Sequence, residues 1–476
     1  MLGDILRRSV SLIMLPIYTR YLTPEDYGVV ELLSMLIDFV SLVFGARVGE
    51  AVFRFYCTAS SEKDKKSIIA SALLLSIILS AIGAIIVTIF SGPLANSIFS
   101  DESFKAYIAL FAINLFLEPF LEIPLIHIRA QQKAWLFFMF SVTKLILQLA
   151  LNIYLVVLMK MHVEGVIYSA VITSTIMGII LTGYSVSNSG MNATRAATKT
   201  LFSFSLPLKL AALCSFYLAF GDRYILNMFT DLSQVGIYSL GYKFGFIFLF
   251  LTWVPFQKMW DSERYVIHKK PDAIHIYKKI FLYVSFALIL AGLCISLFTK
   301  DLLIIMSAPA FQSAYEIVPI IIIAYIFQAW SGYCNLGILL SNKTMHIAYA
   351  EVFGALIITI AYFTLIPLYG IYGAALSTVI GFASRFFWTY IKSNQYYNMH
   401  LPWKKVLLMA ILAALFFYLS LLAPNEIMLS ILWRIALIIS FVTASFALPI
   451  FSKNEKDEIW NKVRNLRRAF ILGNQK

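Results

Sequence analysis

Charged side chains are scarce in this sequence. Asp, Glu, Lys and Arg together make up 13% of its 476 residues, whereas 60% of the residues are hydrophobic. That apolar content far exceeds what one water-soluble surface could hide, so the lipid bilayer must act as the solvent for most of the chain. The composition therefore predicts a polytopic membrane protein.

Cysteine and histidine are also few, and they are scattered. The six histidines form no cluster, and the four cysteines include no CxxC pair; they are Cys57, Cys214, Cys294 and Cys334. This distribution supports neither a disulfide framework nor a metal site. A GxxxxGK[ST] motif is absent as well, which argues against ATP hydrolysis by this chain.

Acidic residues are outnumbered by basic ones, 25 against 38, which gives a net charge of +13. In a soluble protein such an excess suggests nucleic acid, but here most of it falls in short loops between apolar runs. We therefore expect no nucleic-acid partner. The basic tail, residues 453–476, places apolar side chains on one helical face and is expected to lie on the membrane surface.

Apolar runs long enough to cross a hydrocarbon core of roughly 30 Å recur along the whole chain. They predict an all-α fold of about fourteen transmembrane helices with no soluble domain between them. The expected spans are 3–22, 28–56, 67–91, 104–128, 135–159, 164–186, 200–221, 235–257, 275–299, 314–340, 344–368, 371–392, 404–423 and 428–451.

Every second loop between these spans carries most of the Lys and Arg residues. The positive-inside rule therefore places both termini in the cytoplasm. Arg7 and Arg8 near the start suggest a signal peptide, but no small-residue cleavage site follows, so we expect a retained first helix. The expected location is the cytoplasmic membrane of a prokaryote. Arg20 and Arg223 then lie near the outer interface, where snorkelling is favoured over phosphate contact.

The stretch PIYTRYLTPEDYGVVELLSML, residues 16–36, sets a pattern for the rest of the chain. One apolar helix ends there in Tyr18, Arg20 and Tyr21, a polar turn follows over residues 23–26, and the next helix is expected to start near Gly28. The result is a charged corner flanked by aromatic rings at the bilayer surface, which suits a lipid headgroup.

An internal repeat accompanies these helices. LTPEDYGVVEL (22–32) resembles LSQVGIYSL (232–240), which aligns Gly28 with Gly236, and GVIYSAVIT (165–173) aligns without gaps to GIYGAALST (370–378). The two offsets are nearly equal, so two six-helix lobes related by a pseudo-twofold axis are expected.

The predicted organisation follows from this repeat. Its parts are an N-terminal lobe (1–186), a cytoplasmic linker (187–199), a C-terminal lobe (200–394), helices thirteen and fourteen (395–452) and the tail (453–476).

These motifs, together with the DRYILNMF run at 222–229, resemble the Wzx-type polysaccharide flippases, in the superfamily that also holds lipid II flippases and MATE drug transporters. The resemblance covers the whole chain. It implies a V-shaped transporter that moves an undecaprenyl-diphosphate-linked oligosaccharide to the outer leaflet by alternating access, with arginines on the first two helices near the substrate.

Ionisable residues inside the spans are the candidate functional groups, since each costs on the order of 2.5 to 3.5 kcal/mol at the centre of a membrane helix. Basic groups would attract a diphosphate. The candidates for diphosphate or sugar binding are Arg7, Arg8, Arg20, Arg47, Arg54, Lys209 and Lys243. Alternatives remain open: Arg54 as a headgroup anchor, and Arg47 as the intrahelical partner of Glu50.

Acidic groups are the candidates for ion coupling or gating, and these are Asp38, Glu118, Glu122 and Glu351. Glu118 and Glu122 lie on one face of a helix distorted by prolines, where carboxylates and freed carbonyls could bind H⁺ or Na⁺. Asp38 and Lys243 are expected to face each other across the twofold axis. A structural ion pair is the alternative for each of them.

The fifth span carries a polar stripe at four-residue spacing, formed by Lys144, Gln148 and Asn152. Hydrogen bonding between helices and contact with a sugar explain this stripe equally well.

Three classes of function compete. The first is a flippase for a polyprenyl-diphosphate-linked oligosaccharide, without a cofactor, acting beside a polysaccharide polymerase and expected to be monomeric. The second is a MATE-like ion-coupled exporter or a lipid II-type flippase. A membrane enzyme is the third, but the outward segments are too short for the large catalytic loop of a polymerase or ligase.

Overall fold

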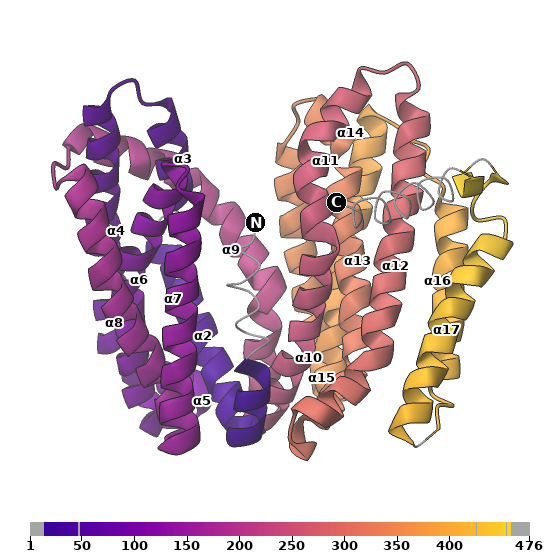
Figure 1. Cartoon of the computed structure of the whole chain (residues 1–476), viewed down its shortest axis with the longest axis horizontal. Coiled ribbons are helices and arrows are strands. Elements are labelled where there is room, and N and C mark those ends of the chain that lie inside the picture. The colour runs from indigo at the N-terminus through magenta and orange to yellow at the C-terminus, as the bar shows by residue number, and fades with distance from the viewer. Residues whose placement is uncertain (1–13, 46–47, 425, 454, 458–476) are drawn as a thin grey trace, which may run out of the picture. The chain divides into compact units, whose positions relative to one another are not determined.

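The computed structural model describes residues 14–45, 48–424, 426–453 and 455–457, and within them the secondary structure is helical without strands. Residues 14–21 are helical, and the remaining order is shown in Figure 1. The α-helices are α2 Pro24–Phe44, α3 Val48–Thr58, α4 Glu62–Ile89, α5 Ser91–Phe99, α6 Lys105–Ala130, α7 Ala134–Asn152, α8 His162–Ser189, α9 Arg195–Phe229, α10 Leu232–Leu251, α11 Trp253–His268, α12 Ala273–Met306, α13 Val318–Cys334, α14 Leu336–Leu340, α15 Met345–Tyr396, α16 Trp403–Ser420 and α17 Ile427–Ala447. Three short segments join them: η1 Glu102–Phe104, the π-helix η2 Ile153–Leu158 and η3 Pro309–Glu316.

The chain is a multi-pass membrane protein. Eleven segments among the described residues are long and apolar enough to cross a membrane. Many large apolar side chains on them are exposed, such as Ile179 at 70% and Leu368 at 73%, as expected of surfaces that face lipid rather than water. The all-helical membrane fold is thus confirmed, but the count of fourteen helices is not.

Two helix boundaries differ from expectation near the N-terminus. The helix expected from Gly28 begins at Pro24, because Thr23 and Asp26 form a reciprocal capping box that satisfies the free amides of the first turn. The single span expected over 28–56 is wrong: α2 ends at Phe44, before Gly45, and α3 begins at Val48. Glycine is one of the residues least favourable to a helix interior.

The longest helix, α15, is interrupted at Gly370. This break agrees with the two separate spans expected over 344–368 and 371–392. Gly370 has φ +52° and ψ −125°, a conformation that glycine adopts much more readily than other residues. The GIYGAALST segment therefore begins at this break.

The structure divides into two compact units that do not follow chain order. Unit 1 comprises Met1–Gly241, Leu303–Ile317 and Ala348–Ser384, and unit 2 comprises Tyr242–Leu302, Val318–Ile347 and Arg385–Lys476.

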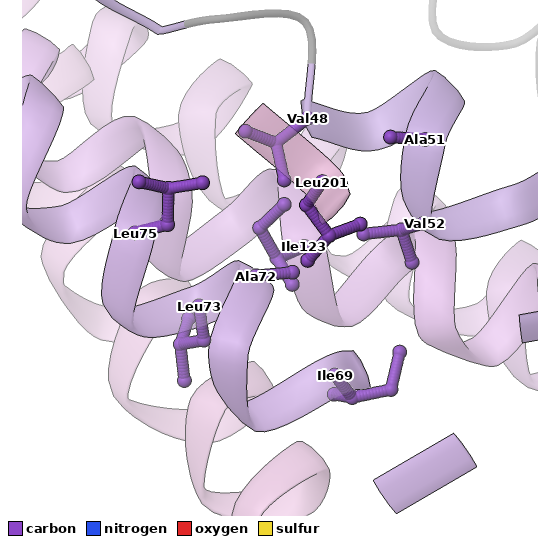
Figure 2. Packing of buried hydrophobic residues seen from close by; sticks show 9 residues of the cluster. All are labelled: Val48, Ala51, Val52, Ile69, Ala72, Leu73, Leu75, Ile123 and Leu201. Carbon is purple, nitrogen blue, oxygen red and sulfur yellow. The ribbon is translucent and has the colours of Figure 1, made fainter. Parts of the chain in front are cut away.

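Unit 1 is built around α6, which packs extensively against α4 and α8. Small residues permit these approaches; Gly83 of α4, for example, lies against Leu115 of α6. Figure 2 shows one apolar cluster in this unit, contributed by α3, α4, α6 and α9. Its members are Val48, Ala51, Val52, Ile69, Ala72, Leu73, Leu75, Ile123 and Leu201.

Unit 2 has an aromatic core. The Trp260 and Tyr333 rings stack with centroids 4.3 Å apart, and Tyr277 lies edge-on to Trp260. The Tyr277 hydroxyl donates to the Arg264 carbonyl at 2.7 Å, so this ring also ties α11 to α12. Burying aromatic rings in contact with one another stabilises the packing of these helices.

Helices α16 and α17 are not a loose addition to unit 2. Arg434 of α17 forms a buried ion pair with Asp301 of α12, with exposed fractions of 6% and 8%. Neither charge can leave this pair without being stranded in an apolar environment, so the pair fixes α17 against α12.

Candidate functional site

A polar stripe runs along α2. Glu31, Ser34, Asp38 and Ser41 follow one another at spacings of three and four, so they share one face of the helix. Most of the remaining α2 positions are buried and apolar. Asp38 is exposed although it lies well inside the expected span. A carboxylate tolerated at this depth indicates a polar environment.

The stripe faces a second carboxylate on α6. Glu118 accepts a hydrogen bond from Ser41 and interacts electrostatically with Lys144 of α7. Asp38 in turn interacts with the charges of Glu118 and Glu31. The structure therefore brings together two of the predicted coupling residues, Asp38 and Glu118, from helices that are 80 residues apart in the chain.

A tyrosine completes this group of side chains. The Tyr224 hydroxyl of α9 donates to the Leu32 carbonyl at 3.2 Å, and the ring lies within electrostatic range of Asp38. We call Glu31, Asp38, Ser41, Glu118, Lys144 and Tyr224 the α2 polar cluster. With three carboxylates and one ammonium it is net acidic, so it suits a proton or another cation better than an anion.

Glu122 lies one turn beyond Glu118 and is exposed. Its carboxylate reaches the backbone of α3 at Gly49, where an added Cβ would stand 3.1 Å from the Glu122 Oε1 atom. The fourth predicted coupling residue, Glu351, is buried at 8% exposure in α15, within unit 1.

Lys209 and Arg20 each contact the C-terminal end of a helix. The Lys209 Nζ donates to the Val43 carbonyl of α2 at 2.8 Å, and the Arg20 Nη2 donates to the Ile305 carbonyl of α12 at 2.9 Å. The last carbonyls of a helix lack partners within it, and a cation there also complements the helix dipole. Both residues thus have a structural role, and their role in substrate binding stays a prediction.

The remaining basic candidates differ in their surroundings. Arg54 of α3 is exposed, with its guanidinium 4.8 Å from the Phe204 ring centroid. Lys243 of α10 is partly buried and belongs to unit 2, so its expected approach to Asp38 stays a prediction. Arg7, Arg8 and Arg47 lie outside the described residues.

In the polar stripe predicted on the fifth span, which is α7, Asn152 makes hydrogen bonds between helices. Asn152 is fully buried, and its Oδ1 accepts from the Tyr18 hydroxyl at 3.1 Å and from the Ser169 hydroxyl at 2.9 Å. It ties the N-terminal helix to α7 and α8.

Snorkelling of Arg223 into the outer interface, which the sequence predicts, is wrong because the side chain is buried inside the protein. Arg223 is 1% exposed, and its Nη1 lies 2.7 Å from the Oδ1 of Asp222, which is 0% exposed. The other Asp222 oxygen accepts from the Tyr238 hydroxyl at 2.6 Å. Adjacent opposite charges within an apolar run were the available signal, because such neighbours can neutralise each other in a low dielectric.

No group of three or more His, Cys, Asp or Glu side chains placed to hold a metal ion occurs in the part of the chain that the structure describes.

A family model described as polysaccharide biosynthesis protein matches residues 17–262, just over half of the chain. Among curated proteins, no relative matches this sequence.

Solved structures share the fold at low sequence identity. The lipid II flippase MurJ in an inward closed conformation has a TM-score of 0.73 and 14% identity, covering 94% of this chain and 98% of MurJ. An inward-facing multidrug resistance MATE transporter of the MOP superfamily has a TM-score of 0.63 and 15% identity, covering 82% and 94%. A MOP superfamily transporter from Pyrococcus furiosus has a TM-score of 0.53 and 14% identity, covering 83% and 93%.

Proposed function

Because this chain belongs to the polysaccharide biosynthesis protein family, we propose that it is a flippase for a polyprenyl-diphosphate-linked oligosaccharide. The substrate would pass from the cytoplasmic to the outer leaflet of a prokaryotic cytoplasmic membrane by alternating access. The observation that carries this proposal is the family match over residues 17–262, joined to a fold shared over 94% of the chain with a protein described as a lipid II flippase.

The basic residues in and beside the spans support the choice of an anionic substrate. Lys243 and Arg54 are proposed to contact the diphosphate, since guanidinium and ammonium groups are the usual protein partners of phosphate oxygens. Lys209 and Arg20 are proposed to contribute positive potential from their places at helix ends.

The α2 polar cluster supports coupling to an ion gradient. Asp38 and Glu118 interact in a net-acidic group, so a proton or Na⁺ bound there would relieve repulsion between the two carboxylates. No cofactor is proposed. We also propose that the flippase hands its cargo to a polysaccharide polymerase.

The same cluster favours one alternative. The net-acidic cluster, in which the Asp38 carboxylate is exposed, would suit an organic cation, and the MATE transporter shares this fold, so export of a cationic small molecule is the second candidate. A lipid II-type flippase is a further alternative, because the lipid II flippase MurJ also shares this fold.

Complementation separates these functions. In a strain lacking its own oligosaccharide flippase, the native chain should restore surface polysaccharide, and Asp38→Ala or Lys243→Ala should fail at equal membrane abundance. Asp101→Ala and Lys343→Ala, which change loop residues, are the matched controls and should complement. Increased resistance to cationic drugs without restored polysaccharide would support the exporter instead, and rescue of a strain depleted of its lipid II flippase would support that class.

A further inference from the structure

One short turn in each repeat has the same position and the same backbone geometry. Residues 131–133 join α6 to α7, and residues 341–344 join α14 to α15. Each turn connects two segments that are long and apolar enough to cross a membrane, so each lies directly at the end of a span. The loop charges predict that both turns face the cytoplasm.

Both turns end the preceding helix with a Schellman motif. The Lys133 amide donates to the Ile128 carbonyl at 3.2 Å. The Lys343 amide donates to the Ile338 carbonyl at 3.1 Å. The residue before each lysine has a positive φ, as this motif requires. An apolar side chain frequently occupies the position of these lysines and packs back on its helix. The turn by itself therefore does not explain a lysine at this position in both repeats.

The two lysines also meet a tyrosine in the same way. The Lys133 Nζ donates to the Tyr184 hydroxyl at 3.0 Å and lies 5.6 Å from the centroid of that ring. The Lys343 Nζ lies 4.8 Å from the centroid of the Tyr396 ring. Both tyrosines stand near the C-terminal ends of the last helices of their repeats, α8 and α15. An aromatic face attracts a cation, so each ring holds its ammonium group in place.

We call Lys133 with Tyr184 the Lys133 corner, and Lys343 with Tyr396 the Lys343 corner. The first pair belongs to unit 1 and the second to unit 2. Each corner is thus complete within one unit, and a ligand at one corner does not require the other.

The positive charge of the corners is not balanced by the segments that build them. Those segments contain no Asp or Glu over residues 123–163, 165–221, 317–350 and 352–425. Each corner instead has a second basic residue nearby in sequence, the exposed Arg129 before Lys133 and Lys392 one turn before Tyr396. A headgroup with a cation beside its phosphate finds no carboxylate in these segments, so a net anionic group is favoured.

A large apolar side chain follows each lysine and is exposed. Trp135 is 72% exposed and Met345 is 61% exposed. The Trp135 ring stacks on the Phe138 ring, with centroids 5.6 Å apart. Tryptophan is enriched where the hydrocarbon core meets the headgroups. A lipid with its phosphate at the lysine would therefore place the beginning of its acyl chains beside an apolar surface.

We propose that the Lys133 corner and the Lys343 corner each bind the phosphate of an anionic phospholipid in the cytoplasmic leaflet. An ammonium group has three donors, and Tyr184 accepts one from Lys133, so donors remain for phosphate oxygens. Lysine binds phosphate as a point charge, which suits a headgroup that can rotate. These sites are separate from the proposed transport function, because lipid binding can be measured without transport.

The basic loop between α11 and α12 is less suited to a lipid headgroup. The segment Leu232–His268, which precedes it, has 37 residues. A helix of that length measures about 55 Å, whereas the hydrocarbon core is roughly 30 Å thick. Lys269 and Lys270 follow this long segment directly and are both exposed. They therefore provide a control with the same charge on the same predicted side.

Native mass spectrometry of the purified full-length chain tests the proposal. With dioleoylphosphatidylglycerol added in detergent, the native chain should retain two more lipid molecules than with dioleoylphosphatidylcholine. Lys133→Gln and Lys343→Gln should each weaken binding about tenfold at one site, because each removes a charge-assisted hydrogen bond. The double variant should lose this affinity at both sites.

The control variant Lys269→Gln/Lys270→Gln removes the same charge and should bind phosphatidylglycerol as the native chain does. Equal binding by the control and by Lys133→Gln/Lys343→Gln would overturn the proposal. Equal retention of phosphatidylcholine by the native chain would overturn the preference for an anionic lipid. Displacement of the bound lipid by inorganic phosphate would assign the corners to free phosphate instead.

Thermal unfolding separates lipid binding from a purely structural role of the lysines. Phosphatidylglycerol should raise the unfolding temperature of the native chain and of the control, since a ligand that binds only the folded state stabilises it. The shift should be absent from Lys133→Gln/Lys343→Gln. An unchanged shift in this variant, together with a lower unfolding temperature before lipid is added, would show that the lysines only stabilise the turns.

Discussion

Arg223 and Asp222 are neighbours in the sequence and are both almost fully buried. Their pairing leaves the second Asp222 oxygen for the Tyr238 hydroxyl, and Arg223 also lies 5.5 Å from the Tyr238 ring centroid. This arrangement neutralises two charges inside an apolar bundle and links α9 to α10. Its energetic importance lies in the cost of breaking it, since removing one partner strands the other charge.

We predict that Arg223→Met lowers the free energy of unfolding by about 3–5 kcal/mol, because the Asp222 carboxylate would be buried without its cation. The double variant Asp222→Leu/Arg223→Met should recover much of that loss. Thermal unfolding of the purified protein in detergent would measure both. Arg54→Met, at an exposed position, is the control, and a loss as large there would refute the explanation.

At the scale of helices, ends and crossings decide where each element lies. Thr23 starts α2 by capping, Lys209 contacts the end of α2, and Arg20 contacts the end of α12. Each of these polar contacts satisfies backbone groups that a helix cannot satisfy itself, a requirement that is strict where no water is at hand.

The crossing of α2 and α10 depends on glycine at both positions. Gly28→Ala and Gly236→Ala should each destabilise the protein by about 1–3 kcal/mol, because the new methyl group meets a backbone carbonyl that cannot rotate away. Gly183→Ala is the matched control in α8, with no atom within 4 Å of its added Cβ. It should be neutral or stabilise by roughly 0.5–1 kcal/mol. Unfolding midpoints of the three variants would decide; equal effects at all three would show that close approach is irrelevant.

At the scale of the whole molecule, the α2 polar cluster is the feature that could link ion binding to transport. It joins α2, α6, α7 and α9 of unit 1, so a change in its charge acts on four helices at once. Coupling requires that the bound ion favours one conformation over the other.

We predict that Asp38→Asn combined with Glu118→Gln and Glu351→Gln leaves only a slow residual transport that no longer depends on H⁺ and Na⁺ gradients. Neutral side chains cannot change charge with ion binding, so the α2 polar cluster and position 351 would each stay in one charge state. Initial transport rates in proteoliposomes, with and without each imposed gradient, provide the measurement. Glu164→Gln, at an exposed position on α8, should keep the dependence. Unchanged gradient dependence in the triple variant would rule out these carboxylates as the coupling groups.

By itself, the sequence determined the membrane environment, the helical fold and the break before the last helix of the second repeat. Hydropathy, net charge and glycine placement are local properties, and the bilayer acts on each segment in the same way wherever it lies in the chain. The alignment of Gly28 with Gly236 was also readable, because a repeat is a comparison of sequence with sequence.

Only the tertiary structure decided which charges meet. The sequence predicts that Arg223 snorkels near the outer interface, yet Tyr238, 16 residues from Asp222, helps to bury the Asp222–Arg223 pair. Asp38 meets Glu118 and Arg20 meets Ile305 across far longer separations. Such partners depend on how helices pack, which no local pattern encodes. The α2 polar cluster is for this reason a property of the folded chain, even though every residue in it is visible in its sequence.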